Sequence, residues 1–170
     1  MKGKWAAGIP PRHITWVLPE RLAVSERPGG RTNSHRKVRR QEEIIWLKEN
    51  GFTVVVSLLD SPQNLAAYQE LDVPYAHHPI PTTGEQGQAL INLYKDLAER
   101  QRAQETVLIH HDELGDRMIG VIAGYLIWTR RLDGAPAATS VVERLFGHQL
   151  GPEGRALAAT ADTLPRVPIS

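Results

Sequence analysis

Cysteine is absent from the 170-residue chain, and this absence excludes more chemistry than any other feature of the composition. Without cysteine there is no disulfide, no thiolate metal ligand and no cysteine nucleophile. No apolar run approaches the roughly 20 residues that a helix needs to cross a bilayer. The segment "MKGKWAAGIPPRH" carries charge but lacks an apolar core of about 7–15 residues, so it does not resemble a signal peptide. We therefore expect a cytoplasmic protein.

An excess of charge of one sign is also missing. The chain has 20 Lys and Arg, 19 Asp and Glu, and a formal net charge of +1. Such a chain creates no global field toward nucleic acid or an anionic membrane, and we expect neither as a partner. Because 41% of the residues are hydrophobic and 23% are charged, the composition indicates a globular protein with one core.

Strand-like and helix-like patterns alternate along the sequence. This alternation predicts a single α/β domain with a four- to five-stranded, mostly parallel sheet flanked by helices. The domain is expected over residues 14–163, after an N-terminal extension (1–13) and before a flexible tail (164–170). The predicted strands cover 14–18, 22–24, 52–59, 73–80 and 105–111, and the predicted helices cover 39–50, 61–71, 84–101 and 117–131. Residues 135–149 and 152–162 are expected to give one or two further helices.

Local signals set some of the predicted boundaries. Gly51 stands where a glycine commonly ends a helix. Ser61 followed by Pro62 is typical of an N-cap and first helical turn. Thr82 with Glu85 matches a capping box, so Thr82 is interpreted first as an N-cap.

The stretch "VLIHHDELGDRM", residues 107–118, carries the strongest functional signal. An apolar strand ends in two histidines, an acidic loop follows, and Arg117 opens an apolar helix. In open α/β sheets the ligand site lies beyond the carboxyl ends of the strands. We therefore predict the site at the loop from His110 to Arg117, with the Pro79–Thr83 loop overhanging it.

Over roughly residues 14–150, the order of these pieces resembles the dual-specificity, protein-tyrosine-phosphatase-like family. That family's signature is a His, a nucleophilic Cys, five residues and an Arg. The same register here gives His110, His111, five residues and Arg117, so His111 replaces the thiol. The resemblance implies that Thr82 occupies the general-acid position, and that Arg117 and loop amides surround a phosphoryl group.

The departures from the signature exclude a classical cysteine phosphatase. Our first hypothesis is a pseudophosphatase that binds a phosphorylated or other anionic ligand, or a phosphorylated protein, at the loop. No organic cofactor is implied. The residues expected to bind the ligand are Arg117, His111, Asp112, Glu113, Leu114, Gly115 and Asp116.

Two alternatives would make the protein a phosphoric monoester hydrolase. In one, His111 is the nucleophile, Asp112 or Glu113 orients its imidazole, and water or Asp116 protonates the leaving group. In the other, a divalent metal is held by His78, His111 and Asp112. Imidazole and carboxylate ligands suit zinc, iron or manganese, although adjacent strand residues point to opposite faces.

Three further interpretations concern individual groups. His110 is expected to be a structural hydrogen-bonding residue behind the loop. If the loop opened outward, Arg117 would instead pair with Asp112 or Asp116, and the anion hypothesis would fail. The basic stretch from Arg27 to Arg40 is predicted to be a solvated loop and helix start, with attraction of an acidic partner as the alternative.

Overall fold

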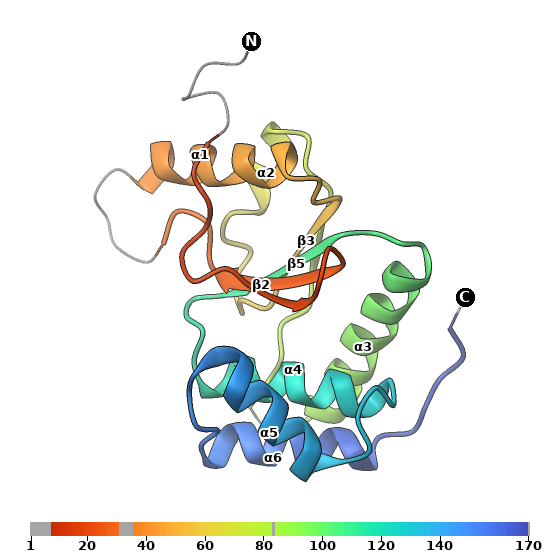
Figure 1. The fold of residues 1–170 in the computed structure, drawn as a ribbon. Coiled ribbons are helices and arrows are strands. Elements are labelled where there is room, and N and C mark those ends of the chain that lie inside the picture. The colour runs from red at the N-terminus through yellow and green to blue at the C-terminus, as the bar shows by residue number, and fades with distance from the viewer. Residues whose placement is uncertain (1–7, 31–35, 83, 170) are drawn as a thin grey trace. The chain divides into compact units, whose positions relative to one another are not determined.

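The computed structural model describes residues 8–30, 36–82 and 84–169, and it confirms the predicted α/β fold class (Figure 1). The chain forms two compact units. The first contains the residues up to Pro79 together with Ala103–Glu113, and the second contains Ile80–Arg102 and the residues from Leu114 onward.

The first unit holds a five-stranded sheet in the order β1-β2-β5-β3-β4. Only β1 runs antiparallel, as the first arm of a hairpin with β2, and the other neighbours are parallel. The sheet is therefore mostly parallel, as predicted, and it has five strands, the larger of the two predicted numbers. The strands are β1 (Thr15–Leu18), β2 (Leu22–Glu26), β3 (Val54–Ser57), β4 (Tyr75–His77) and β5 (Val107–His111).

Two helices pack on one face of this sheet: α1 (Arg36–Glu49) and α2 (Leu65–Glu70). Alternating strand residues Ala23, Val55 and Leu108 share a buried cluster with side chains from both helices. The end of α1 is explained by Gly51, which has φ +84° and supplies the left-handed residue that commonly follows a helix.

The predicted start of α2 was wrong. The helix begins at Leu65 rather than directly after Ser61, and Asn64 precedes it with φ 72°. Asparagine tolerates this left-handed conformation, and the Asn64 side chain donates a hydrogen bond to the carbonyl oxygen of Pro28 at 2.7 Å. A tertiary contact therefore fixes the turn that the local Ser-Pro signal suggested would be helical.

Among its described residues, the second unit contains four helices with α4 at their centre. They are α3 (Gln86–Arg102), α4 (Asp116–Trp128), α5 (Ala135–Phe146) and α6 (Pro152–Thr163). All α4 residues from Met118 to Trp128 are buried. The backbones of α4 and α6 meet at two glycines, since a Cβ added to Gly120 would lie 2.5 Å from Gly154 Cα. This close approach explains why neither position carries a side chain.

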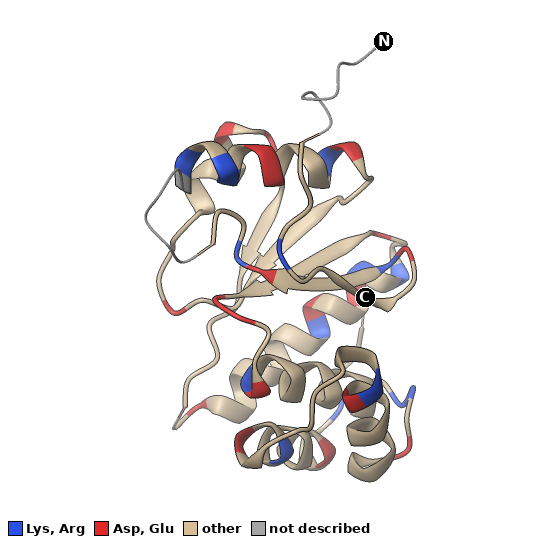
Figure 2. Ribbon diagram, turned by 60° about the vertical axis from the view of Figure 1, so that its left-hand side comes forward, with Lys and Arg blue, Asp and Glu red and all other residues tan. Residues whose placement is uncertain are grey.

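Acidic and basic positions are interspersed along the helices (Figure 2), as the balanced composition suggested. None of the described helices is long and apolar enough to span a membrane.

Candidate functional site: the loop from His110 to Arg117

The backbone at the end of β5 is fixed by the strands on either side of it. Leu58 N–H donates to the carbonyl oxygen of His110 at 3.0 Å, and Arg27 N–H donates to that of His111 at 2.8 Å. Because β5 is hydrogen-bonded on both sides, the two histidines are held in place before any side-chain contact is considered.

His110 is a buried structural residue, as its predicted role required. Its Nε2 lies 2.8 Å from the hydroxyl of Tyr68, while its Nδ1 has no hydrogen-bond partner among the described residues. Burial, followed by the charges of Arg27, His111 and His77, lowers the pKa of His110 to about 3. The imidazole is therefore neutral at physiological pH and contributes no positive charge to an anion site.

Asp112 is paired with Arg27, which the sequence had placed in a solvated stretch. Arg27 is only 7% exposed, and its Nε lies 3.5 Å from Asp112 Oδ1. One of its terminal nitrogens also donates to the carbonyl oxygen of Gly30 at 3.1 Å. The prediction for Arg27 was wrong because residues distant in sequence bury its guanidinium. Asp112 therefore has a counter-charge within the first unit.

A second ion pair, in which the carboxylate is the buried partner, holds the turn that follows Arg27. Glu43 is almost fully buried, accepts a hydrogen bond from Gly29 N–H, and pairs with Arg39 at 2.9 Å. Burial raises the pKa of Glu43, and the contacts with Gly29 and Arg39 oppose that shift. The only local signal for this network was the i, i+4 spacing of Arg39 and Glu43.

Arg117 lies in the first turn of α4, and both of its terminal nitrogens have partners in the second unit. One nitrogen lies 2.6 Å from Glu153 Oε1, and the other donates to the carbonyl oxygen of Ile80. Arg117 is 20% exposed, and Glu153 is 52% exposed. Gly115 precedes α4 with extended backbone and offers no side chain to cap it. The guanidinium is thus fixed on one side and paired with a solvated carboxylate on the other.

Asp116 is turned toward α6. Its two carboxylate oxygens accept hydrogen bonds from Gly151 N–H at 2.5 Å and Gly154 N–H at 2.8 Å. Asp116 therefore caps α6 from another helix, and its geometry gives no support to a role in protonating a leaving group. The outward-loop alternative, in which Arg117 pairs with Asp112 or Asp116, was wrong because all three residues have other partners.

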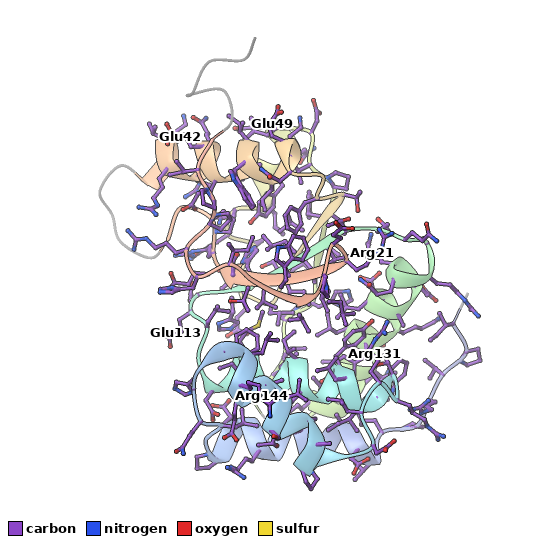
Figure 3. The ribbon with its side chains drawn as sticks, viewed as in Figure 1. Arg21, Glu42, Glu49, Glu113, Arg131 and Arg144 are labelled. Carbon is purple, nitrogen blue, oxygen red and sulfur yellow. The ribbon has the colours of Figure 1, made fainter. Side chains whose placement is uncertain are left out.

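The remaining loop residues differ in exposure. His111, Leu114 and Gly115 are half-buried, whereas Glu113 is exposed, and Figure 3 shows its side chain directed outward. His78 is also half-buried. Within residues 8–30, 36–82 and 84–169, no three His, Asp or Glu side chains are grouped in a way that could hold a metal ion.

The Pro79–Thr83 loop is described except at Thr83, which lies outside the described residues. Its contact with the loop from His110 to Arg117 is the hydrogen bond from Arg117 to Ile80, both in the second unit. Helix α3 begins at Gln86, and the carbonyl oxygen of Glu85 accepts the hydrogen bond from Ala89 N–H. The N-cap prediction for Thr82 was therefore wrong, because the helix starts later than the capping-box pattern indicated.

No protein-family model matches this chain, and no curated protein matches it in sequence. Solved structures do match it. A kinase-associated phosphatase, in a form with its catalytic cysteine replaced by serine, aligns with a TM-score of 0.74 and 21% identity, covering 91% of this chain and 96% of that chain. Human DUSP28 aligns with a TM-score of 0.63 and 17% identity, covering 91% and 95%.

A third similar structure is the core catalytic domain of the PP-IP phosphatase SIW14 from S. cerevisiae, solved in complex with citrate. It aligns with a TM-score of 0.62 and 13% identity, covering 93% of this chain and 88% of that chain. The alignments extend over nearly the whole length of each chain. This protein therefore has the fold of the dual-specificity and protein-tyrosine phosphatases.

Proposed function

We propose that this protein is a pseudophosphatase that binds a phosphorylated or other anionic ligand, small or carried on a protein, through Arg117 and the first amides of α4. The observation that carries the proposal is the pairing of Arg117 with Glu153, on a phosphatase fold whose chain contains no cysteine. Arg117 is held in place, yet the carboxylate beside it is half in solvent.

The weak pairing of Arg117 with Glu153 would allow the anion of a ligand to replace the Glu153 carboxylate as the partner of Arg117. Ion pairs with such exposure contribute about 0–1 kcal/mol to stability. A phosphate group carries more charge than Glu153 and offers several acceptor oxygens to the planar guanidinium. The N-terminus of α4 adds a favourable dipole for the same anion. We therefore expect a phosphoryl group to take the place of Glu153.

Asp112 and Asp116 do not oppose this proposal as strongly as their charges suggest. Asp112 is neutralised by Arg27, and Asp116 is engaged by the two amides of α6. Glu113 is exposed, so water screens its charge. Arg117 is therefore the cation available to an anion in the first turn of α4.

A second candidate function is hydrolysis with His111 as the nucleophile. It is favoured by the division of roles between the two histidines, since His110 is buried against Tyr68 and His111 is half-buried. A ring nitrogen of His111 would attack phosphorus, the bond to the ester oxygen would break, and water would protonate the leaving alkoxide. A second water would then hydrolyse the phosphohistidine.

One experiment separates these functions. Binding of inorganic phosphate and phosphotyrosine would be measured by calorimetry, and hydrolysis of a small aryl phosphate would be followed with and without divalent metals. The variants are Arg117→Ala, His111→Ala and, as a matched control on α5, the exposed Arg144→Ala. We expect no turnover, and we expect binding that Arg117→Ala weakens about tenfold or more.

The possible contrary results are distinct. Binding that is equally strong in Arg117→Ala and Arg144→Ala would overturn the proposed site. Turnover that disappears with His111→Ala would replace the pseudophosphatase with the hydrolase. Turnover that requires a divalent metal would favour a metal-dependent hydrolase involving His78, His111 and Asp112.

A further inference from the structure

The backbone partner of Arg117 is the carbonyl oxygen of Ile80, in the segment that precedes α3. Arg117 donates to this oxygen through one terminal nitrogen. The side chain of Ile80 is only 3% exposed, whereas Glu153, the other partner of Arg117, is 52% exposed. The position of the guanidinium therefore depends mainly on where the Ile80 carbonyl is held.

Pro81 makes the orientation of that carbonyl depend on the backbone that follows it. The proline ring fixes φ of Pro81 at about −65°, and it also restricts the backbone of the preceding residue, Ile80. Between the carbonyl oxygens of Ile80 and Pro81, the chain therefore has one freely variable dihedral, ψ of Pro81. A contact that fixes the Pro81 carbonyl thus limits the orientation of the Ile80 carbonyl as well.

Gln86, in the first turn of α3, makes this contact. Its Nε2 donates a hydrogen bond to the carbonyl oxygen of Pro81 at 3.0 Å, and its side chain is half-buried. The same helical turn lies against the residue that follows α6, because a Cβ added to Gly87 would be 3.3 Å from Leu164 Cδ2. Buried side chains anchor the rest of α3. Gln86 therefore connects a packed helix with the segment that holds Arg117.

Gln88 provides the comparison on the same helix. Its Nε2 donates to Oδ1 of Asn92 at 2.9 Å, and its side chain is exposed. This hydrogen bond is local to α3 and does not reach the segment before it. The two glutamines thus separate the contact with Pro81 from the general effect of a substitution near the start of α3.

We infer that Gln86 is the positioning residue for Arg117. Gln86 fixes the Pro81 carbonyl, the rigid proline transmits this restraint, and the Ile80 carbonyl holds the guanidinium where an anion can meet it. The inference rests on the proposed function, in which Arg117 binds the phosphoryl group. It adds a requirement beyond positive charge, because a planar guanidinium must also face the anion that it binds.

Gln86→Met tests the inference, because methionine keeps the unbranched shape and the helix propensity of glutamine but cannot donate a hydrogen bond. Gln88→Met is the matched control. On the full chain, calorimetry measures the Kd of inorganic phosphate, and NMR measures the order parameter of the Arg117 Nε–Hε bond, whose signal is assigned by its loss in Arg117→Ala. A thermal unfolding curve verifies that each variant is folded.

We expect Gln86→Met to weaken phosphate binding roughly three- to tenfold. The order parameter of Arg117 should fall below about 0.6, the range of a flexible group. Gln88→Met should leave both quantities unchanged. The order parameter reports the orientation of Arg117 itself, which a purely structural role of Gln86 in α3 would not alter.

The contrary results distinguish this inference from the proposed function. If phosphate binds through Arg117 but Gln86→Met changes neither quantity, the positioning role is overturned and the proposed function stands. Equal effects of Gln86→Met and Gln88→Met would also overturn it, as would weaker phosphate binding with Arg117 still ordered. If the wild type binds no phosphate at millimolar concentration, the proposed function fails, and the order parameter still decides whether Gln86 holds Arg117.

Discussion

The two ends of the loop from His110 to Arg117 differ in how far their charged groups are exposed to water. The strand end, His110–Asp112, contains a buried neutral imidazole and a carboxylate paired with a nearly buried arginine. The helix start, Gly115–Arg117, contains a half-buried arginine beside an exposed glutamate. The strand end resists changes of charge because the His110 imidazole is fully buried and the Arg27 guanidinium is only 7% exposed, while Asp112 itself is 37% exposed. The helix start can exchange partners because water already reaches one of them.

In the proposed pseudophosphatase, this difference would decide which end of the loop keeps a binding function. A buried network is constrained by folding whether or not a ligand binds. An arginine held by one backbone carbonyl and one solvated carboxylate keeps both its position and the capacity to accept another anion. Our proposal therefore assigns ligand binding to the helix start and structural support to the strand end.

The largest expected effect concerns pH and the strand end. The pKa of His110 is about 3 in the folded protein, against 6.5 for an ordinary histidine. Below pH 6.5 the unfolded chain binds a proton that the folded chain does not, so stability falls as the pH decreases from 6.5 to 3. The contribution of His110 approaches about 1.4 kcal/mol per pH unit. Urea unfolding at several pH values measures the slope.

Asp and Glu carboxylates also titrate in this pH range, so the urea experiment alone does not identify His110. The ¹⁵N NMR chemical shifts of the His110 imidazole report its protonation state directly. In the folded protein, His110 should remain neutral at about pH 5. If His110 were charged at that pH, the strand end would not contain a buried neutral imidazole, and the comparison with the helix start would fail.

The next largest effect is expected from Asp116→Ala. This substitution removes the acceptor for two amides of α6, which become unsatisfied where they are partly buried. The free energy of unfolding should fall by about 2–3 kcal/mol. Asp162→Ala, an exposed position on the same helix, should change it by less than about 0.5 kcal/mol. Equal effects of the two variants would argue against a capping role for Asp116.

The smallest effect on stability should come from Glu153→Gln, which sharpens the comparison most directly. Because the pair with Arg117 is exposed, the free energy of unfolding should change by less than about 1 kcal/mol. Phosphate should bind more tightly, since its internal competitor has lost its charge. A large loss of stability with no gain in phosphate affinity would mean that Glu153 is a structural partner only.

Much of the architecture was predictable because it depends on local patterns. The apolar run before Ser57 gave a buried strand, and Gly51 gave the end of α1. The strongly apolar composition of residues 117–131 gave a mostly buried central helix, which is α4. The position of Arg117 at its start followed from the same pattern, and so did the location of His110 at the end of β5.

The rest depends on contacts between distant residues. Asn64 reaches Pro28, and Arg27 reaches Asp112, across separations that no local signal records. Glu153 was not predicted as a partner of Arg117 because it lies on a helix whose packing was unknown from the sequence. Thr82 shows the opposite failure: a local pattern was present but misleading. Thr82 and Glu85 match a capping box, yet the helix begins only at Gln86.

The contact between Gly120 and Gly154 has a consequence for cooperativity. A Cβ added to Gly120 would clash with the backbone of Gly154. A Cβ added to Gly154 would clash with both the backbone and the carboxylate of Asp116. Helices α4 and α6 consequently share an interlocked surface that cannot separate in small steps. Opening of either helix exposes the other, so the two should exchange their amide hydrogens as one unit. Arg117 and Glu153, one on each helix, are then kept together by the backbone itself rather than by their own attraction.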